Sequence, residues 1–205
     1  MKIQTLRLWL GMIFLFVGIL LAVVYNWGHY YTFFSIGAFL ILLEVYRQIS
    51  GKEVFEGWNI LNHFVFWGLL TIASLFIDSF GVDAGYWVYP HYFTLTDEVF
   101  KIFFEWVVPL AYLMITLMIG INILNKKYSL RTSTLLSLLS LVIITGFVTE
   151  FINNFANSWR ILKMPLSSFE IRGYFLVFQT FGYWALAAIP YLIYNLVLKF
   201  RRDEK

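Results

Sequence analysis

The apolar residues of this chain gather in long blocks that polar residues separate. Amphipathic helices and half-buried strands would instead show periods of about 3.6 and 2 residues. A helix that crosses a bilayer needs about 20 mainly apolar residues, within a range of roughly 17–25. Five of the blocks meet this length and the second is shorter. We predict six membrane-spanning helices, at Leu8–Tyr25, Tyr31–Tyr46, Ile60–Phe80, Val99–Leu124, Ser133–Asn153 and Tyr174–Leu198.

A helical bundle is the expected fold, because backbone polar groups inside lipid must be paired within a helix or a closed barrel. Barrel strands alternate apolar and polar residues over about 10 positions, and these blocks do not alternate. We therefore predict an all-α polytopic membrane helical bundle. It forms a single membrane domain over residues 1–205, built as three hairpins over residues 8–46, 60–124 and 133–198.

Composition narrows the chemistry. Charged residues make up 13% of the chain, against about 25% in soluble domains. Cysteine is absent, so disulfides, thiolate chemistry and cysteine metal sites are excluded. His29, His63 and His91 are dispersed across the predicted membrane, and no phosphate-binding or hydrolase motif is present. We predict no metal and no cofactor.

The positions of lysine and arginine predict the orientation, since cytoplasmic loops carry an excess of these residues. Of the 15 Lys and Arg, eleven fall at one end of the predicted bundle and four, Lys101, Arg160, Lys163 and Arg172, at the other. We expect a multi-pass protein of the cell membrane with both termini in the cytoplasm. The basic C-terminal tail fits a lipid-contacting anchor and not a nucleic-acid patch.

The second and third hairpins resemble each other. Asp78 ends one span and Trp87 follows nine residues later, while Glu150 ends another span and Trp159 follows nine residues later. Each tryptophan precedes a proline, and each following span carries a tryptophan and a proline. The similarity indicates either a degenerate repeat or two generic aromatic-rich segments. The outer loops are roughly 20 residues long, a length typical of functional or disordered loops, and we expect order there, with short interfacial helices.

Ionisable residues inside or at the ends of spans are costly to bury, so they are candidate functional groups. A carboxyl in an apolar cavity can hold a proton near neutral pH and act as a general acid. The candidate catalytic residues are Asp78, Asp97, Glu98, Glu105 and Glu150. The candidate substrate-binding residues are Trp87, Tyr89, Phe104, Trp106, Trp159 and Arg160.

Structural explanations compete with each of these roles. Lys101 stands four residues from both Asp97 and Glu105, a spacing that favours a ladder of ion pairs along one helix face. Asp78 and Glu150 could be solvated at the ends of their spans, or Arg160 and Lys163 could neutralise Glu150 or bind an anionic headgroup. Aromatic residues favour the headgroup level of a membrane. That preference alone would account for Trp27, Tyr30, Tyr31, Trp87, Tyr89, Tyr92 and Trp159.

The segment from Asp78 to Pro90 resembles a motif of the membrane-integral lycopene cyclase domain of bacteria and archaea. In that family an Asp ends a helix, and a small apolar residue, a Gly, a Trp and an aromatic follow at the spacing of Val82, Gly85, Trp87 and Tyr89. A Pro-x-Glu-Glu signature then opens the next helix, where this chain has Leu95-Thr96-Asp97-Glu98. Phe103, Phe104 and Pro109-Leu110 follow, as Phe-rich sequence and Pro-Leu do in the family.

The resemblance implies a small all-helical membrane domain with two related halves. It also implies that acidic residues protonate an isoprenoid end, so that a ring closes without a redox change. In this chain Asp97 and Glu98 would be the acids and Asp78 and Glu150 their partners, in a cavity lined by aromatic side chains.

Three functions remain open. The first is this enzyme, the second a non-catalytic binder, sensor or accessory subunit, and the third a small transporter. Catalysis predicts that Asp97 and Glu98 point into a closed pocket near Asp78 or Glu150. A binder predicts that these acids pair with Lys101 or solvent, and a transporter predicts a polar path to Glu44 or His63. The expected partners are membrane lipids, an isoprenoid or other apolar small molecule and a second copy of the chain, but no nucleic acid.

Overall fold

The computed structural model describes residues 3–92, 94–162, 170–171, 174–175 and 182–203. Six helices in this part of the chain are long and apolar enough to cross a membrane, which confirms the predicted all-α bundle. The first three spans are α1 (Ile3–Val23), α2 (Tyr30–Ser50) and α3 (Ile60–Asp83). The fourth comprises α4 (Leu95–Phe100), the π-helical segment η1 (Lys101–Val107) and α5 (Val108–Leu124). The fifth comprises α6 (Leu130–Ser137), η2 (Leu138–Val142) and α7 (Ile143–Ala156), and the sixth is α8 (Tyr183–Asp203).

The bounds of all six predicted spans differ by some residues in the structure. The second runs to Ser50, is 21 residues long and ends at Gly51, whose left-handed backbone conformation (φ 73°) terminates the helix. The sixth begins at Tyr183 and not at Tyr174. Tyr174–Phe175 instead forms β4, which pairs antiparallel with β3 (Glu170–Ile171). Short apolar runs do not distinguish a strand from a helix, which explains the early start in the prediction.

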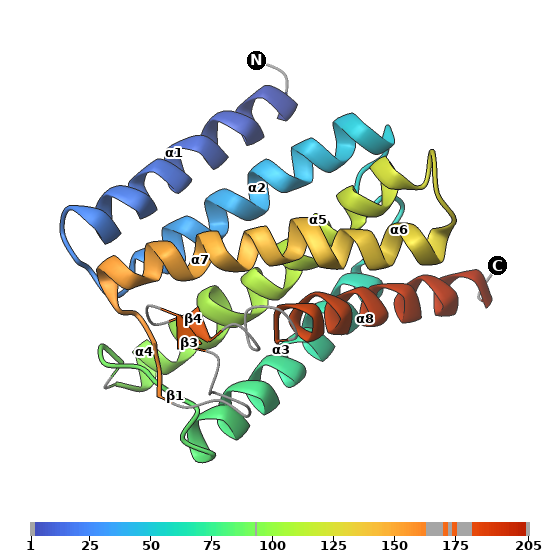
Figure 1. Cartoon of the computed structure of the whole chain (residues 1–205). Helices are drawn as coiled ribbons and strands as arrows, with labels where there is room; N and C mark the ends of the chain where they lie inside the picture. The colour runs from blue at the N-terminus through green and yellow to red at the C-terminus, as the bar shows by residue number, and fades with distance from the viewer. Residues whose placement is uncertain (1–2, 93, 163–169, 172–173, 176–181, 204–205) are drawn as a thin grey trace.

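Helix α5 lies at the centre of the bundle (Figure 1). It is apolar on all sides, and its residues from Pro109 to Ile121 are all buried. A helix without a polar face is stable only where neighbours cover it completely. Helices α2, α6 and α8 pack directly against it, and it therefore forms the wall that the site shares with the core.

Helices α1 and α2 form a close hairpin at the edge of the molecule (Figure 1). A Cβ atom at Gly18 would lie 2.6 Å from the backbone nitrogen of Phe34, and one at Gly37 would lie 2.3 Å from that of Leu15. Small residues allow helix backbones to approach this closely in membranes. The hairpin places the N-terminal end of α2, which carries Tyr30 and Tyr31, against the site.

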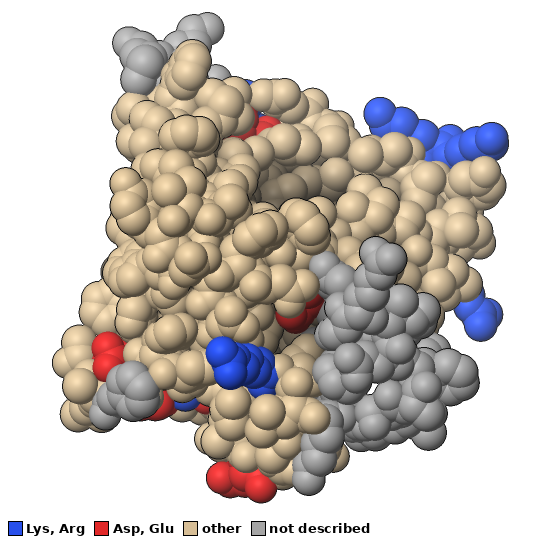
Figure 2. All heavy atoms as spheres, turned by 60° about the vertical axis from the view of Figure 1, so that its left-hand side comes forward, with Lys and Arg blue, Asp and Glu red and all other residues tan. Residues whose placement is uncertain are grey.

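The two ends of the bundle are built differently. At the end that holds the first described residues of α1, the 51–59 connection is fixed by an Arg7–Glu53 ion pair of 2.8 Å. There Tyr194 also donates to the carbonyl of Val54 at 2.6 Å. The strands and α4 lie at the opposite end (Figure 1). Charged side chains are few on the face in Figure 2, and most of that face is covered by uncharged residues.

A short antiparallel strand pair joins the two long loops at the cavity end of the bundle. In it β1 (Trp87–Val88) pairs with β2 (Arg160–Ile161), with Trp87 opposite Ile161 and Val88 opposite Arg160. The amide of Leu162 also donates to the carbonyl of Tyr86 at 2.7 Å. The interfacial helices expected in these loops are not present between Ala84 and Thr94 or between Asn157 and Leu162, within the described residues. Main-chain pairing therefore holds the second and third hairpins together above the site.

The fourth span contains a π-helical turn next to a proline. Pro109 has no backbone N–H, so it cannot donate to the carbonyl four residues earlier. Just before it, the amide of Val108 donates to the carbonyl of Phe103, a five-residue step. Wide turns of this kind are frequent at functional sites. Here the wide turn carries Lys101, Glu105 and Trp106, all of them buried.

Candidate functional site

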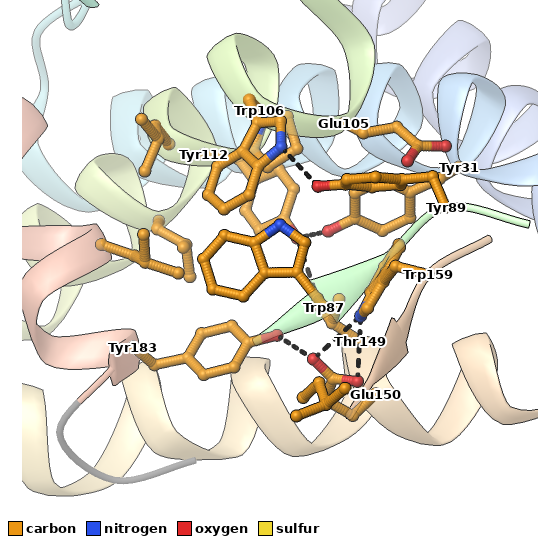
Figure 3. Close-up of a pocket in the computed structure, with 15 residues that line it drawn as sticks. Tyr31, Trp87, Tyr89, Glu105, Trp106, Tyr112, Thr149, Glu150, Trp159 and Tyr183 are labelled. Carbon is orange, nitrogen blue, oxygen red and sulfur yellow. Dashed lines mark hydrogen bonds between the residues drawn. The ribbon is translucent and has the colours of Figure 1, made fainter. Parts of the chain in front are cut away.

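A cavity of about 60 Å³ lies between the second, fourth, fifth and sixth spans and the two loops that carry β1 and β2 (Figure 3). Seven of its fifteen lining residues are aromatic, and Glu105 and Glu150 are also among them. Small-molecule sites typically combine mainly apolar walls with a few polar groups. The lining residues are Tyr31, Trp87, Tyr89, Glu105, Trp106, Pro109, Leu110, Tyr112, Leu113, Thr149, Glu150, Trp159, Ile161, Tyr183 and Leu186.

Asp78 holds three of the aromatic walls in place from the last turns of α3. Its Oδ1 atom accepts from Tyr89 Oη at 2.7 Å, from Trp106 Nε1 at 3.0 Å and from Trp87 Nε1 at 3.4 Å. Its Oδ2 atom lies 3.0 Å from Lys101 Nζ. Both carboxylate oxygens therefore have partners, and Asp78 is a positioning residue for the cavity walls.

Burial raises the pKa of the Tyr89 hydroxyl well above its usual value, and the nearby Asp78 carboxylate raises it further. The phenol therefore stays protonated and donates a hydrogen bond to Asp78. Trp106 Nε1 donates in turn to the phenol oxygen at 2.7 Å. Lys101 Nζ lies 4.5 Å from the centre of the Tyr89 ring. The wall between Asp78 and the cavity is a connected network in which each donor has an acceptor.

Glu150 forms a second unit of the same kind at the end of α7. Trp159 Nε1 donates to both of its oxygens, at 3.3 and 3.2 Å, and Tyr183 Oη donates to Oε1 at 3.1 Å (Figure 3). In both units a buried acid receives the indole N–H of the tryptophan nine residues later. The correspondence ends at the next tryptophan, because Trp184 donates to the carbonyl of Leu138 whereas Trp106 donates to Asp78.

A glycine makes room for one ring in each unit. A Cβ atom at Gly81 would lie 1.8 Å from the Trp87 ring, and one at Gly146 would lie 2.7 Å from the Tyr183 ring. Real Cβ contacts are not this short. The absence of a side chain at these positions therefore lets Trp87 and Tyr183 reach the acid on the same helix as the glycine.

Glu105 differs from the other two acids because one of its oxygens is unpaired. The carboxyl is 7% exposed, and Oε1 accepts from the hydroxyl of Tyr92. Burial raises the pKa of the Tyr92 hydroxyl, and the Glu105 carboxylate adds to this effect, so the phenol stays protonated and donates. Oε2 is buried and has no hydrogen-bond partner among the described residues. Buried polar atoms nearly always have one, so this atom indicates a missing partner.

The two acids of the sequence signature lie outside the cavity. Asp97 caps helix α4, where its Oδ2 accepts from the backbone N–H and the hydroxyl of Thr94 at 2.9 and 2.8 Å. Glu98 is 49% exposed and lies 2.5 Å from Lys101 Nζ. The expected ladder through Lys101 and Glu105 is not formed among the described residues, since Lys101 binds Asp78 and Glu98 instead.

Two predicted binding residues also lie outside the cavity lining. Phe104 packs against the rings of Phe100 and Phe103. Arg160 is exposed in β2, and no ion pair with Glu150 occurs in the described part of the chain. Lys163 and Arg172 lie outside the described residues. Trp87, Tyr89, Trp106 and Trp159, the other predicted binding residues, line the cavity.

The cavity also uses residues that the sequence did not single out. Tyr31 on α2 and Tyr112 on α5 share a hydrogen bond, and Tyr112 contacts Thr149 Oγ1 at 3.2 Å. Tyr30 and Tyr31 are 0% and 3% exposed, so their assignment to an interfacial aromatic belt was wrong. A tyrosine at the end of a span fits both settings, and no sequence signal separates them.

Asp78 also borders a groove on the outside of the bundle, between α3 and the α4–η1 turn, with a volume of about 380 Å³. Its other lining residues are Thr71, Leu75, Ser79, Leu95, Glu98, Val99, Ile102 and Phe103.

The described residues contain no group of three or more His, Asp or Glu side chains that could hold a metal ion. No protein-family model, curated protein or solved structure matches this chain.

Proposed function

We propose that this protein binds the polar end of a small lipid-soluble molecule in the cavity between Glu105 and Glu150. The observation that carries the proposal is the buried Oε2 atom of Glu105, a residue that lines the cavity; this atom has no partner among the described residues. A buried acceptor without a partner costs about 1–3 kcal/mol. A ligand that donates a hydrogen bond to this atom would recover that energy on binding.

The surroundings support binding more directly than catalysis. Asp97 caps a helix, and Glu98 pairs with Lys101 at the surface. The pairing of Glu98 with Lys101 is the one expected of a binder, whereas the capping role of Asp97 was not expected. Asp78 and Glu150 have both oxygens occupied by donors from the walls. Glu105 therefore offers the vacant contact, and the other two acids fix the shape of the cavity around it.

Extraction of the purified protein tests this proposal. Wild type in mild detergent should retain an organic molecule that mass spectrometry detects at close to one per chain. Glu105→Gln keeps the size of the side chain, but its one acceptor oxygen is used by the Tyr92 hydroxyl, so an NH2 donor takes the vacant position and the variant should lose the molecule. Glu98→Gln, on the exposed side of the same span, should keep it. Equal retention by all three proteins would overturn the proposal.

A second candidate is proton-initiated ring closure of an isoprenoid, as the resemblance to lycopene cyclases implies. The observation that favours it is that Glu105 has an unpaired oxygen and lines a cavity with aromatic residues, whose rings stabilise positive charge. In this scheme Glu105, not Asp97 or Glu98, adds a proton to the terminal double bond. The resulting cation is attacked by an internal double bond, and the ring loses a proton. Expression in lycopene-accumulating cells tests it, and unchanged lycopene would exclude that substrate.

We also propose that the protein resides in the cell membrane with both termini in the cytoplasm. The proposal is supported by the excess of lysine and arginine at the end of the bundle that is opposite the cavity. In this orientation the cavity would lie near the outer face of the membrane.

A further inference from the structure

We infer that the polar end recognised by this cavity is an ammonium group, so that the ligand is a lipid-soluble primary or secondary amine. This inference rests on the proposed binding function and specifies its ligand class. Three features support it: the balance of charge around the cavity, the direction of the wall donors, and the identity of the vacant contact.

The described charges around the cavity are predominantly negative. Glu105 and Glu150 are both 7% exposed and line the cavity, and neither forms an ion pair in the part of the chain that the structure describes. Lys101, on the same π-helical turn as Glu105, is held by two other carboxylates, Asp78 at 3.0 Å and Glu98 at 2.5 Å. Buried charges are normally paired, so a cation in the cavity would supply the missing positive charge.

The indole donors of the wall are directed at carboxylates, and the rings that carry them line the cavity. The indole N–H groups of Trp87 and Trp106 are directed to Asp78, and that of Trp159 to Glu150. The centres of the Trp87 and Trp106 rings lie 5.7 Å apart. The negative faces of aromatic rings attract ammonium groups, and this attraction is strongest for tryptophan. A neutral alcohol could use the vacant acceptor but would gain little from these rings.

The vacant contact and the volume restrict the cation further. An ionised Glu105 carboxylate can only accept hydrogen bonds, so a nitrogen bound at Oε2 must carry a hydrogen. A quaternary ammonium lacks that hydrogen and is therefore a poorer fit than a primary or secondary amine. The cavity of about 60 Å³ takes the ammonium and a few carbons, but not a whole lipid.

A pair of matched probes tests the inference: n-butylammonium and 1-butanol, each titrated into the wild-type protein in nanodiscs and followed by calorimetry and tryptophan fluorescence. The ammonium should bind at least about tenfold more tightly than the alcohol. Glu105→Gln should weaken ammonium binding by about tenfold or more, whereas Glu98→Gln should leave it unchanged. The comparison of the two probes on wild type needs no variant, so it stands even if Glu105→Gln folds poorly.

The outcomes distinguish a failure of this inference from a failure of the proposed binding function. If 1-butanol binds as tightly as n-butylammonium, the inference that the ligand is an ammonium is overturned, while the proposed ligand binding at Glu105 stands. If the extracted molecule is not an amine and n-butylammonium does not bind, the cation is likewise excluded. If no molecule is retained and neither probe binds, both the inference and the proposed function are overturned.

Discussion

At the scale of residues, the site is built from acids that position aromatic rings. Asp78 and Glu150 each receive the indole N–H of the tryptophan nine residues later, and phenol donors complete both carboxylates. These contacts turn flexible loop residues into fixed walls, because each ring is held at its polar edge. The shape of the cavity therefore depends on Asp78, which does not line it, as well as on the aromatic residues that do.

Gly81 offers a direct test of this dependence. Gly81→Ala would place a methyl group within the volume of the Trp87 ring and drive the indole away from Asp78. Overpacking of this kind costs about 1–3 kcal/mol. We expect that loss of unfolding free energy, measured in mixed-detergent titrations, together with a red shift of tryptophan fluorescence.

Gly68→Ala is the matched control for that substitution. It lies on the same helix, and a Cβ atom there meets nothing within 4 Å. We expect unchanged fluorescence and an unfolding free energy equal to that of wild type or up to about 1 kcal/mol higher, because alanine favours a helix over glycine. If both variants behave alike, the close approach of Trp87 to α3 does not contribute to stability.

Individual residues could be predicted from the sequence only where their position permitted one role. Glu105 stands deep in an apolar span, so an interior position was predictable, and the nine-residue spacing of acid and tryptophan was visible. Asp97 was assigned to chemistry by resemblance, although Thr94 three residues earlier also matches a helix-capping box. Tyr31, Tyr112 and Tyr183 were missed because their roles depend on partners in other helices.

At the scale of elements, the fourth span determines where the functional groups lie. The wide turn at Lys101–Val107 places Lys101 toward Asp78 while Glu105 meets Tyr92, an arrangement that a regular helix with a four-residue ladder was not expected to give. The number of predicted helices was correct, because the length of each apolar block in the sequence indicates whether it can cross a membrane. Their ends were less accurate, since capping and strand pairing are settled by tertiary contacts.

Pro109→Ala tests the origin of the wide turn. Alanine restores a backbone N–H that can donate to the carbonyl of Glu105, so the turn should tighten and rotate the Glu105 carboxyl relative to the cavity. We expect helix content by circular dichroism to stay the same and retention of the extracted molecule to fall at least about fivefold, corresponding to about 1 kcal/mol.

Pro190→Ala provides the comparison, because Pro190 lies inside α8 and is not part of the cavity lining. Retention should remain at the wild-type level in this variant. A similar loss from both variants would show that the proline in the fourth span has no special relation to the site.

At the scale of the whole molecule, the bundle has one end closed by ion pairs and loop contacts and another that contains the cavity. Hydrophobic block length and charge placement were sufficient to predict the number of spans and a proposed orientation. They could not predict that two outer loops pair with each other, because two-residue strands leave no periodic signal in a sequence.

The proposed orientation can be measured by cysteine labelling, because the natural chain contains no cysteine. Asp83→Cys lies at the cavity end, and Asn125→Cys lies in the connection at the opposite end, both at exposed positions. In intact cells, a membrane-impermeant maleimide should label Asp83→Cys and should reach Asn125→Cys only after permeabilisation. The reverse pattern would place the termini outside.

Because β1 pairs with β2, a change in the number of residues in this part of the chain would disturb the cavity more than a change in residue type. Successive strand residues face opposite sides, so a shift of one position exchanges the two faces. One residue inserted between Tyr86 and Trp87 would turn the indole to the side that Val88 now occupies, where 37% of the Val88 side chain is exposed. Homologous chains that keep the cavity should therefore vary in residue type along this stretch long before they vary in length.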